Sequence, residues 1–363
     1  MKQIGLFLLI AILFGGCSSK ETLTRGSVEQ VNSDYPTGHG LWYYLPETVI
    51  QVEIIAEKTV ARSGPFFRFS QRFLNVSDVI TENKEEWRIV GAKVTTVGRP
   101  DKTRLFRVES SGNPSVTALT LSENGVLHGI NLPFIPEVTT GVAKSDQPVI
   151  SLADINFNDV PFTEEQLIRT SSTAMAEEVA REIYRLREMR SNILEGDVDL
   201  LPPDEGSYAI VMAEIDRKEQ AYLELFTGRT RTQQVSRVYE FVPRPGKTLN
   251  TVLLRFSHQN GFLDSMDVSG TPVYIEVDVH EQAAYNFLND EHDKSPNRRG
   301  MVYCYPVEAV VRIIDRTLLL NEQKVNLAQF GQLVRMPADL LDATNVVVEM
   351  DERTGAVKRI SYK

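Results

Sequence analysis

The sequence predicts an α+β protein that is mostly β, with two antiparallel β domains, sandwich or barrel-like, and a long αα-hairpin between them. Three observations predict this class. Apolar and polar residues alternate with a period of two over residues 49–60, which is typical of a half-buried strand. Over residues 172–227 the apolar residues recur every three or four positions, which is typical of amphipathic helices. From residue 232 onward short β-type segments return at regular spacing.

The chain has 363 residues, a length that favours two or three domains. We divide it into a lipoprotein signal peptide at 1–16, a polar tether after an acylated Cys17 at 17–34, an N-terminal β-rich domain at 35–160, a helical hairpin at 161–231 and a C-terminal β domain at 232–363.

The first residues have the features of an export signal. Lys2 supplies a positive charge, and residues 4–14 form an apolar run that is shorter than the ~20 residues of a membrane span. Two glycines then precede Cys17. This pattern resembles the bacterial lipobox, in which the cysteine is acylated and begins the mature chain, although Phe14 stands where leucine is usual. Because lipid chains contribute about 0.8 kcal/mol per buried CH₂, we predict anchoring by lipid on Cys17. The alternative is a secreted protein with a chance cysteine.

The N-terminal domain is predicted to contain strands at 49–60, 87–98 and 104–109 and a hairpin at 117–131. In the first of these strands one face is apolar, formed by Ile50, Val52, Ile54 and Ala56. The hairpin has an Asn-Gly turn at 124–125, which requires positive φ.

A phenylalanine-rich segment lies between these strands, at residues 64–74. The spacing of its phenylalanines predicts a short amphipathic helix packed on the sheet. The alternative interpretation is an aromatic and basic binding face that includes Arg68 and Arg72.

Two long helices are predicted at about 172–195 and 205–227, ended by Gly196 and Gly228. Thr163 and Gln166 fit a capping box. Carboxylates in the loop between the long helices could hold Ca²⁺, but the EF-hand order is absent, so Asp204 is interpreted as an N-cap.

The C-terminal domain is predicted to contain short β segments at 235–243, 251–266, 271–279, 307–314, 317–331 and 346–362. Three segments of the chain share one frame, in which β residues precede a polar turn that ends in Gly125, Gly261 or Gly355. We interpret the frame as hairpins that need glycine at a bulge, and the alternative is a duplicated β unit.

Composition and motifs exclude several classes of function. The net charge of −10 argues against a nucleic-acid partner. Cys17 and Cys304 are too far apart in the sequence for a zinc motif, and no two histidines have helical metal spacing, so we predict no metal and no cofactor. The acidic segment 289–294 is interpreted as a solvated loop rather than a metal site, and Cys304 as a buried, inert thiol.

No nucleophile elbow, phosphate-binding loop, dinucleotide fingerprint or zinc-protease motif is present, so no catalytic residue is predicted. A glycosidase with two carboxylates stays open, because it needs no local motif. Trp42, Tyr43 and Tyr44 are interpreted as an aromatic core cluster, and the alternative is a carbohydrate-stacking platform.

Several segments of this chain resemble, in the same order, a Bacteroidetes lipoprotein family catalogued only as domain of unknown function 4831. They are LWYYLPETVIQVEI (41–54), GPFFRFSQRFL (64–74), AREIYRLREMRSNILEGDVDLLP (180–202), ELFTGRT (224–230) and LAQFGQLVRMP (327–337). The resemblance covers nearly the whole mature chain and implies a Gram-negative bacterium and an envelope location. It implies no activity, and it supplies no catalytic residues to carry over.

We therefore expect an outer-membrane lipoprotein, lipid-anchored through Cys17, that acts as a non-enzymatic binding or scaffold protein with an envelope protein as its partner. Whether it faces the periplasm or the cell surface is left open. The alternative is a surface glycan-binding or glycan-processing protein.

Overall fold

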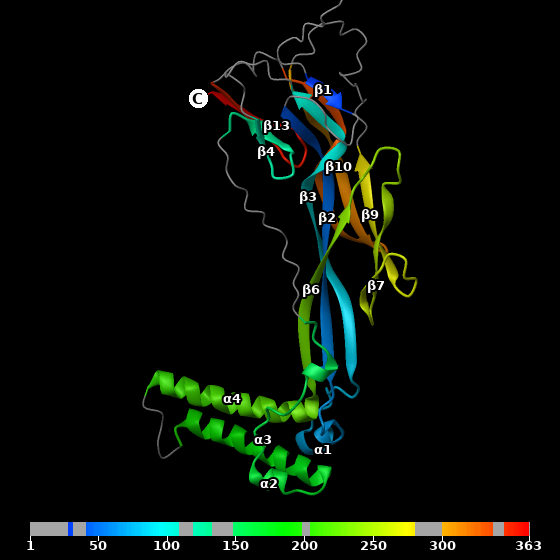
Figure 1. Cartoon of the computed structure of the whole chain (residues 1–363). Coiled ribbons are helices and arrows are strands. Elements are labelled where there is room, and N and C mark those ends of the chain that lie inside the picture. Colours follow the sequence, from blue (N-terminus) through cyan, green and yellow to red (C-terminus); the bar gives the residue numbers. More distant parts are fainter. Residues whose placement is uncertain are drawn as a thin grey trace, which may run out of the picture.

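The computed structural model describes residues 28–31, 41–108, 119–132, 148–197, 204–279, 300–336 and 345–362. These residues form a long β structure, which we call the rod, and a group of helices at one end of it, which we call the arm (Figure 1). The rod holds three antiparallel sheets, so the predicted class, α+β and mostly β, is confirmed.

The first sheet, in the order β1-β3-β2-β6, forms the length of the rod. β2 (Leu41–Arg62) pairs with β3 (Lys84–Val108) from one end to the other. β6 (Arg229–Phe241) pairs with the other edge of β2, and β1 (Val28–Val31) pairs with the last residues of β3. At ~3.3 Å per residue, the 22 residues of β2 span about 70 Å.

The predicted strands at 87–98 and 104–109 belong to one continuous strand, β3. The polar segment between them, RPDKT, lies at an irregularity of this strand: β2 pairs Pro46 with Pro100 and Tyr44 with Leu105, and the register shifts between these pairs. Local sequence did not indicate this continuity.

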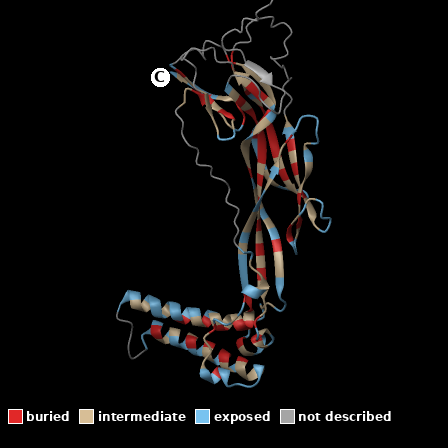
Figure 2. Cartoon of the chain, in the orientation of Figure 1, coloured by how far each residue is buried: buried red, intermediate tan, exposed pale blue. Residues whose placement is uncertain are grey.

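The second sheet has the order β11-β10-β9-β7-β8 and packs on the first. Its strands are β7 (Asn250–Ser257), β8 (Gly261–Leu263), β9 (Thr271–Val279), β10 (Val302–Asp315) and β11 (Leu318–Arg335). The predicted apolar face of β2 faces this sheet, and its four members, Ile50, Val52, Ile54 and Ala56, are fully buried (Figure 2).

The third sheet has the order β13-β12-β5-β4 and lies at the end of the rod away from the arm (Figure 1). Its strands are β4 (Leu119–Leu121), β5 (Leu127–Ile130), β12 (Val346–Met350) and β13 (Val357–Tyr362). β5 pairs with β12, and β2 pairs with β6, so strands of the predicted N-terminal domain pair with strands that lie beyond its predicted boundary. The division into domains stays a prediction.

All three glycines of the shared hairpin frame have positive φ: 78° at Gly125, 73° at Gly261 and 70° at Gly355. This is the left-handed conformation that glycine adopts without strain. The geometry agrees with the bulge interpretation of the frame.

The arm contains η1 (Phe67–Phe69), α1 (Ser70–Leu74), α2 (Glu164–Leu167), α3 (Ser172–Glu195) and α4 (Glu205–Thr227), and η2 (Leu152–Asp154) lies in the segment leading to it. The capping predictions are confirmed: Thr163 and Gln166 form a capping box, Gly196 ends α3 with φ 77°, and the Asp204 side chain accepts from the backbone N–H of Ser207. Part of the loop between α3 and α4, with Asp199, lies outside the described residues.

Helices α3 and α4 lie antiparallel, because Arg187 and Arg190 of α3 pair with Glu219 and Asp216 of α4. The segment at 64–74 does form a short helix, but it packs on these helices and not on the sheet as predicted. Phe66 is buried against Phe226 of α4, with 5.6 Å between ring centroids.

None of the helices in the described part of the chain combines the length and the apolar character needed to cross a membrane.

Candidate functional site

At the joint between rod and arm, two arginines donate to backbone carbonyls, and one of them, Arg229, is buried. Arg229, at the start of β6, donates to the Asn156 carbonyl and pairs with Glu224 and Asp159. Arg62, at the end of β2, donates to the carbonyls of Leu152 and Ile155. The Arg229–Glu224 pair holds the end of α4 at the start of β6, and the Arg62 bonds hold the segment at 152–155 at the end of β2.

Gly228 makes this joint close enough to form. It has φ 91°, and a Cβ there would lie 2.6 Å from the carbonyl oxygen of Arg62. A side chain at this position would therefore push α4 away from β2.

A buried polar network joins the sheets farther along the rod. The Gln329 side chain accepts from the Thr48 backbone N–H at 3.0 Å and donates to the carbonyls of Thr48 (3.0 Å) and Pro243 (2.8 Å). The Thr48 hydroxyl donates to the Arg353 carbonyl at 2.8 Å and accepts from the Ala328 N–H at 3.0 Å. The side chains of Thr48 and Gln329 therefore connect β2, β11 and the turn between β12 and β13.

Cys304 of β10 lies beside this network. Its thiol is fully buried and donates to the Ala328 carbonyl at 3.2 Å. Burial raises the pKa of the Cys304 thiol to about 11, against the smaller opposing effect of Arg104. The thiol therefore stays protonated at neutral pH, as expected of an inert cysteine.

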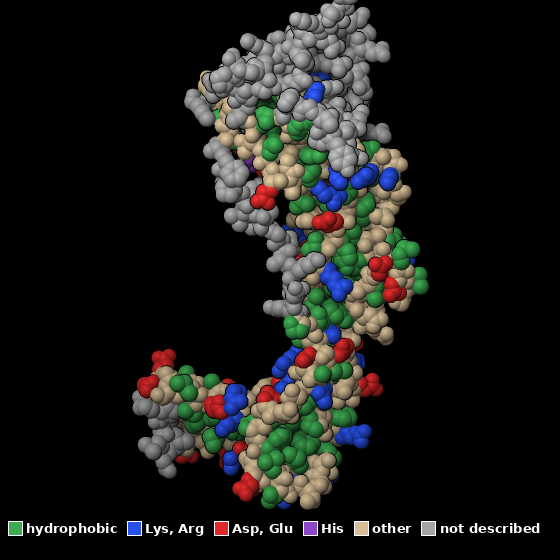
Figure 3. Space-filling view, viewed as in Figure 1, with side chains coloured by type: hydrophobic (Ala, Val, Ile, Leu, Met, Phe, Trp, Pro, Cys, Tyr) green, Lys and Arg blue, Asp and Glu red, His purple; other side chains and the backbone are tan. Residues whose placement is uncertain are grey.

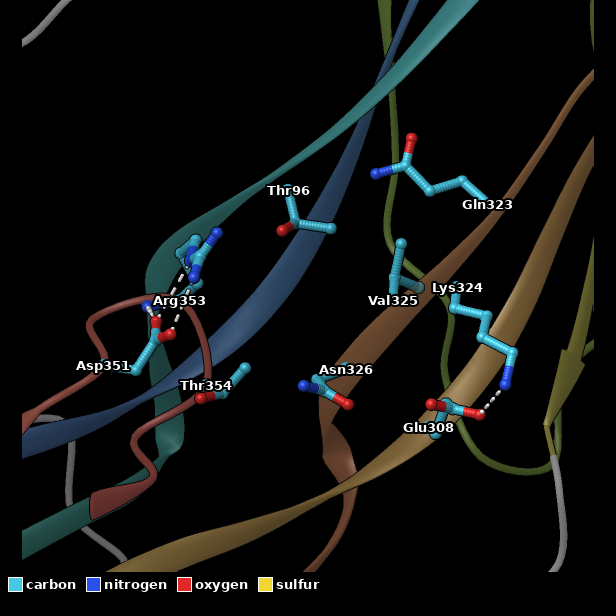
Figure 4. Close-up of a pocket in the computed structure, with 9 residues that line it drawn as sticks. All are labelled: Thr96, Glu308, Gln323, Lys324, Val325, Asn326, Asp351, Arg353 and Thr354. Carbon is cyan, nitrogen blue, oxygen red and sulfur yellow. Dashed lines mark hydrogen bonds and ion pairs between the residues drawn. The ribbon is translucent and has the colours of Figure 1, made fainter. Parts of the chain in front are cut away.

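A polar pocket of about 200 Å³ opens next to the same junction (Figure 4). It is lined by Thr96 of β3, Glu308 of β10, Gln323, Lys324, Val325 and Asn326 of β11, and Asp351, Arg353 and Thr354 of the β12–β13 turn. Strands of the first two sheets and a turn of the third thus supply its walls, which only the tertiary structure brings together.

The charged groups of the pocket are paired. Lys324 lies 2.9 Å from Glu308, and Arg353 lies 2.8 Å from Asp351. Burial acts to raise the pKa of the Asp351 carboxyl, but hydrogen bonds from the side chain and backbone of Arg353 hold it below its usual value. Asp351 is therefore an ionised acceptor at neutral pH and not a proton donor.

The structure does not bring the three predicted aromatic candidates together on one surface. Tyr43 is fully buried, stacks on Phe106, and its hydroxyl both accepts from and donates to the backbone of Val302 at 3.0 Å. Trp42 and Tyr44 are its neighbours in β2, so they point to the opposite face, and Trp42 lies under Arg107.

The two basic candidates lie at the other end of β2. Arg68 and Arg72 are exposed on η1 and α1, each over a phenylalanine ring of its own segment. The length of the rod therefore separates these arginines from Trp42, Tyr43 and Tyr44. Cys17, the lipidation candidate, and the acidic segment 289–294 lie outside the described residues.

Within the part of the chain that the structure describes, no group of three or more His, Cys, Asp and Glu residues could hold a metal ion.

The sequence contained a signal for the buried network but not for the pocket. Thr48 and Gln329 are polar residues set in apolar strand segments, a pattern that marks a satisfied buried polar group. The pocket residues look like ordinary exposed strand and turn residues, because their neighbours in space are far away in the chain.

Comparison with known proteins gives one match. The model of a family described as a domain of unknown function, DUF4831, matches residues 39–358. No curated protein matches the chain, and no solved structure matches it.

Proposed function

The chain belongs to the DUF4831 family, and on this premise we propose that it is a lipid-anchored outer-membrane lipoprotein that acts as a non-enzymatic binding or scaffold protein in the cell envelope. The resemblance noted in the sequence supports a Gram-negative host of the Bacteroidetes type as its source.

The observation that carries this proposal is the distance between the two ends of the rod. β1, the first described strand, pairs with the end of β3 that lies farthest from the arm (Figure 1). Between these ends β2 spans about 70 Å. A lipid on Cys17, eleven positions before the start of β1, would leave the arm at the far end of the molecule from the membrane.

The arm carries the surface that we propose a protein partner contacts. Figure 3 shows hydrophobic side chains gathered on it near its joint with the rod. Leu167 and Ile168, at the end of α2, are 64% and 68% exposed, and Ile210 of α4 is 72% exposed. Exposed apolar side chains mark interaction sites when they cluster, as Leu167 and Ile168 do at the end of α2, whereas Ile210 lies near the start of α4, toward the other end of the arm.

Radiolabelled palmitate tests the anchor. The protein expressed in its host should incorporate the label and fractionate with the outer membrane, and Cys17→Ser should do neither. Cys304→Ser serves as the matched control and should be labelled like the wild type. A wild-type protein without acyl mass at Cys17 would overturn the anchoring.

Site-specific crosslinking tests the partner surface. A photoreactive residue at Ile168 should capture an envelope protein in intact cells, whereas the same residue at Val268, an 85% exposed position on the rod, should not. Equal capture from both positions, or none from Ile168, would contradict a partner on the arm.

The second candidate function is a surface glycan-binding or glycan-processing protein. The polar pocket favours binding, because both of its carboxylates, Glu308 and Asp351, are paired with cations, whereas a glycosidase needs one carboxyl in the acid form. When the protein is tested against a panel of polysaccharides, it should therefore bind without hydrolysing them. Release of reducing ends would contradict a glycan-binding protein without catalytic activity.

A further inference from the structure

The pocket at the junction of the three sheets has the chemistry of a small-ligand site, which none of the sequence motifs indicated. From the size, charge balance and free polar groups of its walls, we propose that this pocket binds one neutral sugar residue. The inference deepens the second candidate function and rests on its binding form.

The size of the pocket limits the ligand. Its volume of about 200 Å³ lies below the ~300–1,000 Å³ of pockets that take drug-sized molecules. One sugar ring is a suitable occupant, and a longer glycan would enter with a single terminal or branching residue.

The charge balance of the pocket limits the ligand further. Its two cations, Lys324 and Arg353, are each paired with a carboxylate, from Glu308 and Asp351 respectively. An anionic ligand would have to compete with these carboxylates, and a cationic ligand with the lysine and arginine. Both pairs reach solvent, so displacing one lowers the affinity of a charged ligand only modestly, and a neutral ligand breaks neither pair.

The free polar groups match hydroxyl groups. The side chains of Thr96, Gln323 and Asn326 have no hydrogen-bond partner among the described residues. A side-chain amide and a hydroxyl each donate and accept hydrogen bonds. Sugar hydroxyls also donate and accept, so these groups can pair with neighbouring hydroxyls of a sugar ring. In Figure 4 these side chains come from β3 on one side and β11 on the other.

The polar groups are held by rigid elements. Glu308 and Asn326 are directly paired across β10 and β11, and the β12–β13 turn is tied to β2 by the Thr48 hydroxyl. Because strand pairing already fixes these walls, they lose little conformational entropy when a ligand binds. A few hydrogen bonds can therefore be enough for binding.

The test is a binding measurement on the full chain in a detergent without a sugar headgroup. Saturation-transfer NMR and calorimetry would compare glucose, galactose, mannose and N-acetylglucosamine with glucuronate and glucosamine, the anionic and cationic analogues. At least one neutral sugar should bind, and it should bind more tightly than both charged analogues.

Asn326→Leu should weaken that binding at least tenfold, because it removes a pocket amide at nearly constant side-chain volume. The matched control is Asn250→Leu, which changes an exposed asparagine on β7 of the same sheet, outside the pocket, and should bind like the wild type.

The proposal is overturned if no neutral sugar binds the folded wild type, if a charged analogue binds more tightly, or if Asn326→Leu binds normally. Palmitate labelling and crosslinking report separately on the envelope role. A labelled, crosslinking-competent protein that binds no sugar would therefore count against the pocket alone.

Discussion

The rod and the arm of this protein are stabilised over very different distances along the chain. In the rod, Gln329 bonds to Thr48, 281 positions away, and Tyr43 bonds to Val302, 259 positions away. In the arm, Arg187 and Glu219 are separated by only 32 positions. The rod therefore needs both ends of the chain before it can form, whereas the arm needs one pair of neighbouring helices and the segment at 64–74 that packs on them.

The difference can be measured because the two regions carry separate probes. Both tryptophans lie in the rod, Trp42 on β2 and Trp87 on β3, so their fluorescence reports on the rod. The helical circular dichroism signal comes mainly from α3 and α4 and reports on the arm. The following variants should affect the two signals differently.

Ile54→Ala should have the largest effect. Ile54 is fully buried between the first two sheets, and deleting its methyl groups should lower the free energy of unfolding by about 2–5 kcal/mol. Urea titration followed by tryptophan fluorescence measures the loss. Ile360→Ala, at a 45% exposed position on β13, is the control and should change stability by less than ~0.5 kcal/mol.

Gln329→Leu should destabilise the rod by about 2–4 kcal/mol, because it leaves the Thr48 N–H and the Thr48 and Pro243 carbonyls buried without this partner. The control is Gln323→Leu, an exposed position on the same strand, which should be nearly neutral for folding. If both variants unfold at the same urea concentration, the polar network does not join the sheets energetically.

The Cys304 thiol should make the rod sensitive to alkaline pH. Its pKa is raised from 9.0 to about 11 by burial, so the folded state keeps a proton that the unfolded state loses. Its contribution is fully present below pH 9.0 and is lost as the pH rises to about 11, at ~1.4 kcal/mol per unit, on the order of 3 kcal/mol in all.

Urea titrations of the wild type and Cys304→Ala across this pH range measure that contribution. The wild type should lose more stability than the variant, because the variant has no thiol to titrate. Equal slopes for the two proteins would contradict the shifted pKa.

Glu219→Gln should act on the arm. The Glu219 carboxylate is only 7% exposed and accepts from Arg187 and Arg190, but both arginines reach solvent. The loss should therefore be about 1–2 kcal/mol, less than for a fully buried pair. The helical signal should melt earlier while the tryptophan signal stays nearly unchanged, and a matched shift of both signals would show that arm and rod unfold as one unit.

Asp204→Ala should have the smallest effect, confined to the first turn of α4. The backbone N–H and the hydroxyl of Ser207 both donate to the Asp204 carboxylate, and these bonds lower the pKa of Asp204. The cap is therefore present at neutral pH and is lost as the pH falls through that lowered pKa. Amide hydrogen exchange at the start of α4 should quicken. Asp204→Asn keeps an N-cap and should restore most of the protection.

The arm shows how far local sequence can predict structure. The spacing of apolar residues and the caps at Asp204 and Gly196 predicted both long helices with their observed ends, since helical bonds join residues four positions apart. The partner of the short helix at 64–74 was predicted wrongly, because the amphipathic pattern shows that one face is buried but not against what.

The candidate site could be predicted only in part. The alternation in β2 identified its buried face, and the inert thiol of Cys304 followed from its apolar surroundings. The residues of the pocket gave no local signal, because Thr96, Asn326 and Arg353 are adjacent only through the packing of three sheets.

The sequence by itself determined the elements that depend on interactions between residues close together in the chain. These are the long helices and their caps, the buried face of β2, and the glycine turns that need positive φ. The tertiary structure alone decided which strands pair, that β3 is continuous, that Tyr43 is buried while Arg68 lies at the opposite end, and that a polar pocket exists. The physical reason is that a strand satisfies its backbone hydrogen bonds only with another strand, and nothing in its own residues says how far along the chain that strand will be.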